Sequence, residues 1–278
     1  MAAGEILLGH PSNQGYTAPP LRLESGHDPL GLLPAAAEPQ RPYPDFTPDD
    51  PPAFRDFGRN GSFLVVRRLA QNVEGFAQGT AAAAADLNQR CPHLAPSIGQ
   101  TIDGEWVAAK IIGRWKDGTP LIDRAGPTGQ GSDRNDFSFA HEDPQGLACP
   151  LGSHIRRANP RDGLDRNDPE SQATINRHRL VRRGRPYTEG GERGLMFTAI
   201  CADIERQFEF IQQRWLFSPS FHGLPGEVDP LLGQGNFTLP TASGPVRLTG
   251  LAQWVTLKGG GYFFLPGRAA LRWLSQPR

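Results

Sequence analysis

The sequence has few cysteines, no net charge and no long apolar run, and each absence argues against a class of protein. Its three cysteines are too widely spaced for a CxxC metal knuckle or a disulfide framework, which favours a reducing compartment. No apolar stretch approaches the roughly 20 residues of a membrane span. Basic and acidic residues both number 29, so the overall charge gives no case for a nucleic-acid or membrane partner.

Common catalytic signatures are also absent. The seven histidines form no HxH, HxxH or HExxH pair, so a zinc hydrolase has no support. No GxSxG, GxxxxGKS/T or GxGxxG motif supplies a nucleophile elbow or a phosphate loop. The first residues lack the basic start and the apolar stretch of a signal peptide, which predicts a cytoplasmic protein.

The charge that is present is unevenly distributed. Between residues 154 and 193 ten arginines stand against six acidic residues, which predicts a local anion-binding patch. RNA phosphates are one candidate ligand, but the patch has neither interleaved aromatic residues nor a basic background.

The order of the expected elements predicts an α+β fold built on a ferredoxin-like antiparallel sheet with helices. High contents of glycine (33) and proline (27) add long loops, including a Pro-rich arm that follows a short initial strand. We expect two regions, 1–58 for the arm with its strand and 59–278 for the domain. Expected strands cover 5–8, 62–73, 171–183, 193–201 and 254–266, and expected helices cover 73–87, 105–112, 202–217 (with Asp203 as N-cap) and 267–274.

One histidine has unusual neighbours, in CPLGSHIRRANPRD at residues 149–162. This segment resembles the proximal haem segment of the DyP-type (dye-decolourising) peroxidases, in which the histidine of an HIR…NPR run binds iron. HRLVRRGRPYTEGGERGLMF (178–197) resembles the distal strand of that family, and residues 202–215 resemble the helix after it. GEILLGHPSNQG near the start and NGSFLVVRRLAQNVEGF at 60–76 resemble its middle section, so the likeness spans nearly the whole chain.

The resemblance implies haem b as cofactor and a role for several residues. His154 matches the axial ligand of the haem iron, and Arg182 matches the distal arginine. Glu205 matches the carboxylate that holds the proximal histidine and gives it imidazolate character. His178 is a rival axial ligand, although its position favours a residue on a strand face.

The remaining site residues surround the expected haem. Arg156 and Arg161, beside the ligand, suit the anionic haem propionates. Leu195 and Phe197, on an apolar strand, are expected to wall the pocket. The implied reaction is reduction of hydrogen peroxide with electrons from dyes, phenols or other small aromatic donors.

This sequence differs from the family at the distal acid. The family carries a GxxDG motif, whose aspartate moves a proton between the peroxide oxygens, upstream of the segment that GEILLG resembles. The three Asp-Gly pairs here, at Asp103, Asp117 and Asp162, lack the required glycine and lie elsewhere in the chain. We therefore expect a fragment of a longer product, or a natural remnant, with impaired activity. The alternative is a non-catalytic haem-binding or structural module.

A chain without the family's first half should also expose an apolar sheet face. The strands RGLMFTAIC and GYFFLP carry enough Leu, Phe and Ile to form it. Either an N-terminal half or a second copy of the chain would be the expected partner.

Overall fold

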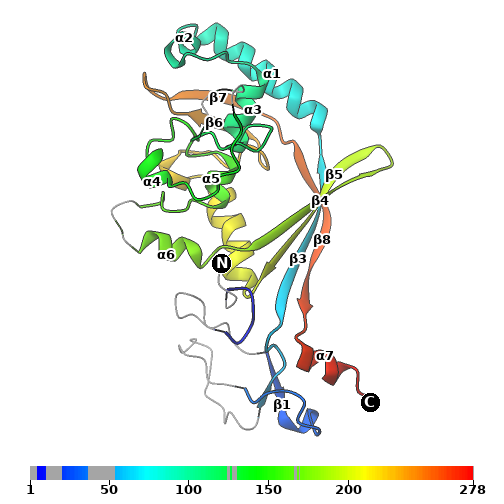
Figure 1. Cartoon of the computed structure of the whole chain (residues 1–278). Helices are drawn as coiled ribbons and strands as arrows, with labels where there is room; N and C mark the ends of the chain where they lie inside the picture. The colour runs from blue at the N-terminus through cyan, green and yellow to red at the C-terminus, as the bar shows by residue number, and fades with distance from the viewer. Residues whose placement is uncertain are drawn as a thin grey trace.

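The computed structural model shows a helical lobe beside one long antiparallel sheet (Figure 1). It describes residues 5–10, 21–36, 54–123, 126, 130–165, 168 and 170–277. Much of the expected Pro-rich arm, including residues 11–20 and 37–53, lies outside the described residues. No helix within the described ranges combines the length and the apolarity that crossing a bilayer requires.

The sheet has four strands in the order β4-β5-β3-β8. Their bounds are β3 Ser62–Gln71, β4 Val181–Glu189, β5 Glu192–Cys201 and β8 Val255–Leu265. Counted along the chain within this sheet, the order is 2-3-1-4, with every neighbouring pair antiparallel. This is the strand order of a ferredoxin-like fold, so the predicted α+β class is confirmed.

The lobe is built around the two longest α-helices and a small second sheet. Leu87, near the end of α1, is fully buried. Gly113, at φ 99°, ends α3 in a left-handed conformation that favours glycine. Trp106 and Trp254 are buried in the core between them. The lobe elements are α1 Val73–Arg90, α2 Leu94–Ile98, α3 Gly104–Ile112, α4 Phe139–Glu142, α5 His154–Ala158, β6 Gly235–Leu239 and β7 Val246–Leu251.

Two helical segments with π-type hydrogen bonding, η4 Ile204–Glu209 and η5 Ile211–Leu216, lie between the lobe and the sheet (Figure 1, yellow). Asp203 caps η4 by accepting a hydrogen bond from the Arg206 amide, as predicted. Phe208 packs on the sheet against Val65 and Ala199, both of which are fully buried.

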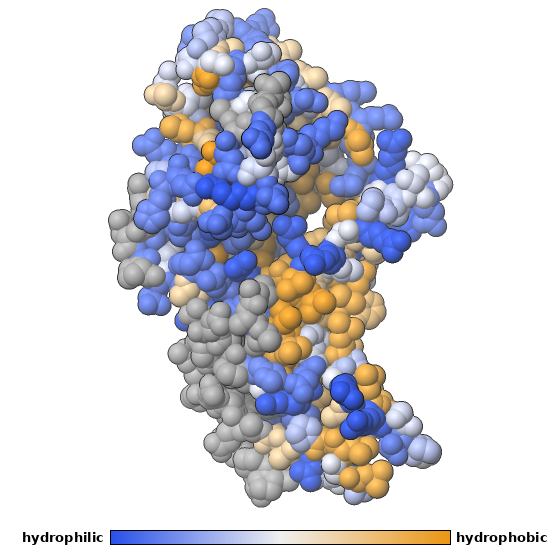
Figure 2. All heavy atoms as spheres, viewed as in Figure 1, coloured by the Kyte–Doolittle hydropathy of each residue, from blue (hydrophilic) through white to orange (hydrophobic). Residues whose placement is uncertain are grey.

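The opposite face of the sheet carries apolar side chains that other described residues leave largely uncovered. Alternation along the strands places Leu64, Val66, Ile200 and Phe263 on it. No described helix lies over its middle (Figure 1), and 52% of Phe263 is exposed. The space-filling view shows apolar side chains gathered along the lower half of the sheet (Figure 2). The described part of the chain therefore leaves an apolar face uncovered, as predicted.

Two predicted strands are wrong. Residues 5–8 form a turn because the Leu8 backbone bonds to Asn60 and Gly61 instead of to a neighbouring strand. Residues 171–176 form a helix, and this conformation buries Ile175 against Trp215. The expected closing strand and helix are present as β8 and α7. The other short elements are β1 Arg22–Glu24, η2 Ser25–His27, β2 Phe54–Asp56, α6 Ser171–Asn176, η6 Phe221–Gly223 and α7 Arg268–Leu274.

Candidate active site

His154 is the first residue of α5, and its ring is held by a buried carboxylate. Its Nδ1 donates to Oδ2 of Asp229 at 2.9 Å, and the Asp229 side chain is fully buried. Oδ1 of Asp229 accepts from the backbone amides of Leu231 and Leu232 at 3.0 and 2.9 Å. No described residue bonds to Nε2 of His154, whose side chain is 27% exposed. The ring is thus fixed on one side and available as a ligand on the other.

The carboxylate that holds His154 is not the one predicted. Glu205 is exposed in the first turn of η4, and the Nδ1 position that it was expected to occupy belongs to Asp229. The assignment of Glu205 is therefore wrong. A signal for Asp229 was present in the segment VDPLL, where an acid stands among apolar residues and needs a partner once buried.

Arg156 is a structural residue and not a propionate ligand. It is completely buried, and its guanidinium donates to the Asp143 carboxylate at 3.2 Å and to the Cys149 carbonyl at 2.9 Å. Asp143 also accepts from the amides of Ala148 and Cys149, so the pair shapes the loop that leads to His154. The predicted contact of Arg156 with a propionate is wrong because its partners lie inside the protein.

Arg161 lies in a half-buried group of cationic side chains. It stacks on the Phe137 ring at 3.9 Å and donates to Oδ1 of Asn135 at 2.8 Å. Arg114, which sequence reasoning missed, donates to the same oxygen at 3.1 Å. Burial lowers the pKa of Arg161 below its ordinary value, and the charges of Arg114 and Arg179 lower it further. Cations held together in this way favour an anionic ligand.

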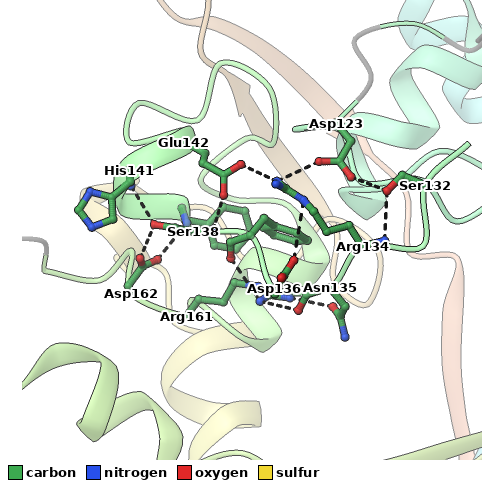
Figure 3. Close-up of polar contacts among 12 residues, drawn as sticks. Asp123, Ser132, Arg134, Asn135, Asp136, Ser138, His141, Glu142, Arg161 and Asp162 are labelled. Atoms are coloured by element: carbon green, nitrogen blue, oxygen red, sulfur yellow. Dashed lines mark hydrogen bonds and ion pairs between the residues drawn. The ribbon is translucent and has the colours of Figure 1, made fainter. Parts of the chain in front are cut away.

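A polar network fixes the loop that carries Asn135 (Figure 3). The Arg134 guanidinium lies between Asp123 at 2.9 Å and Glu142 at 2.5 Å. Ser138 donates to Asp162, which also accepts from the Phe139 amide at 2.9 Å. The loop is therefore fixed in place, and its Asn135 holds the Arg161 side chain.

Arg182 lies on the edge strand β4, on the sheet face that also carries η4. It pairs with Ala199, and Leu195 and Phe197 follow on the same face of β5. Arg182 is exposed, and its charge contributes to lowering the pKa of Arg114, whose main cause is burial. The three residues predicted for the distal side thus share one face, near the cationic group. The space-filling view shows an opening at this level, between the lobe and the β4–β5 hairpin (Figure 2).

The rival histidine has a packing role. The His178 ring stacks on Phe210 with centroids 3.7 Å apart, and Nδ1 donates to the Arg206 carbonyl at 2.6 Å. Its ring is enclosed by a second aromatic neighbour, Trp215. Burial lowers its pKa, as expected for a neutral ring within a core.

The three Asp-Gly aspartates stabilise local structure. Asp103 caps α3, Asp117 accepts from the Thr119 amide, and Asp162 belongs to the network of Figure 3. Within the described ranges no carboxylate pairs with Arg182.

The sequence and the fold of this chain are similar to those of known proteins. The sequence profile "Dyp-type peroxidase, C-terminal" matches residues 107–222. The multifunctional dye peroxidase DyP2 of Amycolatopsis sp. (strain ATCC 39116 / 75iv2) is 32% identical over 266 residues, covering 84% of this chain and 53% of the relative. The chain belongs to the DyP-type peroxidase family.

Further relatives of this DyP-type chain include proteins of Mycetinis scorodonius and Anabaena sp.. The dye-decolorizing peroxidase msp1 of Mycetinis scorodonius is 29% identical over 95% of this chain and 54% of its own length. The crystal structure of the Anabaena sp. DyP-type peroxidase AnaPX superposes with a TM-score of 0.64 and 31% identity, covering 76% of this chain and 45% of that one. The chain therefore spans about half the length of these relatives.

The family implies haem, and the residues present fit it. Haem needs an axial imidazole, cations for its propionates and apolar walls. His154 offers Nε2, Arg161 and Arg114 offer a cationic group, and Leu195 and Phe197 offer apolar surface.

Proposed function

We propose that this chain is the haem-binding part of a DyP-type peroxidase, which reduces hydrogen peroxide with electrons from dyes, phenols or other small aromatic donors. One observation carries the proposal: His154 is fixed through Nδ1 by buried Asp229 while Nε2 has no described partner. A buried carboxylate on the outer nitrogen of an axial histidine is an arrangement that tunes a bound metal.

Each residue has a distinct task in this proposal. When bound at His154, haem b supplies the iron at which peroxide is reduced. Asp229 orients the ring and draws the Nδ1 proton toward itself, which makes Nε2 a stronger donor. Arg182 places a cation where negative charge develops as the peroxide O–O bond breaks. Arg161, with Arg114, holds the propionates.

We propose that the chain alone reacts slowly with peroxide. A base within reach of the substrate contributes about 10²–10⁴-fold in rate, and Arg182 has no carboxylate partner within the described ranges. A carboxylate from another polypeptide segment, either an N-terminal half or a second copy, would supply this base only if it reached the sheet face that carries Arg182. Without it, a haem-binding module that does not turn over peroxide is the second candidate.

Reconstitution with hemin tests the haem assignment. We expect a Soret band in the parent and in the control variant His178→Ala, but none in His154→Ala. A His154→Ala protein that binds hemin as tightly as the parent would refute the assignment. Added hydrogen peroxide then separates the two candidates, because only a peroxidase site shifts its Soret band and recovers it when a phenol is supplied.

Hemin dimethyl ester tests the cationic group separately. Because the ester has no propionate charge, it should bind more weakly than hemin to the parent, and Arg161→Met should remove most of that difference. Arg90→Met, in an exposed helical pair with Asp86, serves as the control and should keep the preference for hemin.

A further inference from the structure

We infer that Arg157 is a positioning residue that holds the backbones of His154 and Asp229 in register with each other. The effect of this positioning on haem binding rests on the function proposed above. The Arg157 guanidinium is completely buried. Nε donates to the Gly152 carbonyl at 3.2 Å, and one terminal nitrogen donates to the Glu227 carbonyl at 2.9 Å. Gly152 lies two residues before His154, and Glu227 lies two residues before Asp229.

The other terminal nitrogen of Arg157 fixes the guanidinium to a third segment. It donates to the carbonyls of Trp215 at 2.8 Å and Ser218 at 3.2 Å, at the end of η5. The Phe221 ring lies 5.0 Å from the guanidinium carbon. An arginine fork has donors in fixed directions, so carbonyls from three segments are held in one geometry.

The segment that carries Asp229 lies outside the helices and strands, and its backbone is tied to the end of η5 by the Asp229 amide, which donates to the Leu216 carbonyl at 2.7 Å. It lies between η6 and β6 and is anchored on its other side by the buried Glu227 carboxylate. That carboxylate accepts from the Thr238 amide at 3.0 Å and the Thr238 hydroxyl at 2.5 Å. Arg157 supplies the tie from this segment toward His154.

Arg156 provides a matched control from the adjacent position. Both arginines are completely buried in α5, and burial lowers the pKa of both below the ordinary value. Arg156 contacts Asp143 and Cys149 and none of the carbonyls that Arg157 holds. A general effect of removing a buried guanidinium should therefore appear in both variants, and a positioning effect only in one.

The first test uses the chain without haem. The His154 Nδ1 proton, assigned by its loss in His154→Ala, should give a protected NMR signal in the parent. We expect that signal to be lost through exchange with water in Arg157→Lys and kept in Arg156→Lys. A signal that survives in folded Arg157→Lys, or is lost equally in both variants, overturns the positioning role. Arg157→Gln is the second variant, and failure of both Arg157 variants to fold while Arg156→Lys folds also overturns it.

The second test uses the haem-loaded protein. Loss of an outer partner of a metal ligand costs about 10–100-fold in affinity, so Arg157→Lys should bind hemin more weakly by this factor, with a raised reduction potential. Arg156→Lys should change neither. Unchanged affinity and potential in Arg157→Lys would contradict the inference. If His154→Ala binds hemin like the parent, the proposed function fails, and the NMR result still decides the role of Arg157.

Discussion

His154 and Asp229 are 75 positions apart in the chain, yet Nδ1 of the ring and Oδ2 of the carboxylate lie 2.9 Å apart. The histidine begins a short helix of the lobe, and the acid lies in the irregular segment before β6. Both oxygens of Asp229 are used, one by the ring and one by backbone amides. The carboxylate cannot turn without losing several hydrogen bonds, so the ring orientation is built into the fold.

Asp229→Asn should weaken hemin binding about 10–100-fold and raise the reduction potential of the bound haem, because a neutral amide draws the Nδ1 proton less strongly. Spectroscopic titration and potentiometry measure the two effects. Glu205→Gln is the control and should leave both unchanged. The reverse result, a large effect at Glu205 and none at Asp229, would restore the original assignment.

Asp143→Asn should lower the free energy of unfolding by about 3–5 kcal/mol, because it removes the charged partner of buried Arg156. Urea denaturation followed by circular dichroism measures the loss. Asp86→Asn, in the exposed pair with Arg90, should cost less than about 1 kcal/mol. An equal loss of unfolding free energy in the two variants would show that the buried Asp143–Arg156 pair stabilises the fold no more than the exposed pair does.

The stability of the chain should fall between pH 6.5 and pH 4. Burial lowers the pKa of His222 from 6.5 to about 4, so the unfolded state binds the proton first as pH falls. The full effect is roughly 3 kcal/mol, is absent above pH 6.5 and is complete below pH 4. His222 has φ 53°, which asparagine tolerates, so His222→Asn should flatten this part of the profile. An unchanged slope in urea titrations across this range would contradict the assignment to His222.

The chain alone should self-associate through the open sheet face. Phe263→Lys places a charge on that face, on the edge strand β8, at little cost to folding, because 52% of the residue is already exposed. Sedimentation velocity should show a smaller species for Phe263→Lys than for the parent. Leu30→Lys, at a 66% exposed position outside the sheet, should behave like the parent. A parent that is monomeric at every concentration would show that the face has no affinity for itself.

Much of the fold follows from local patterns in the sequence. Apolar side chains recur at helical spacing or in alternation over a few residues, and this local pattern predicts five of the elements, α1, α3, β3, β5 and β8. The Asp203 cap and the Gly113 stop are likewise local backbone effects. The errors at 5–8 and 171–176 arose where a contact with a distant segment overrode a weak local preference.

The sequence by itself determined the family, and it predicted which histidine and which strand to test at the haem, because those features are carried by contiguous motifs. Only the tertiary structure decided which carboxylate reaches His154, which arginines are buried and which group into a cationic site. Asp229, Arg114 and Arg157 act through partners 21 to 75 positions away. Such pairings depend on how the segments pack, because burial forces each charged group to find whichever partner the fold brings near.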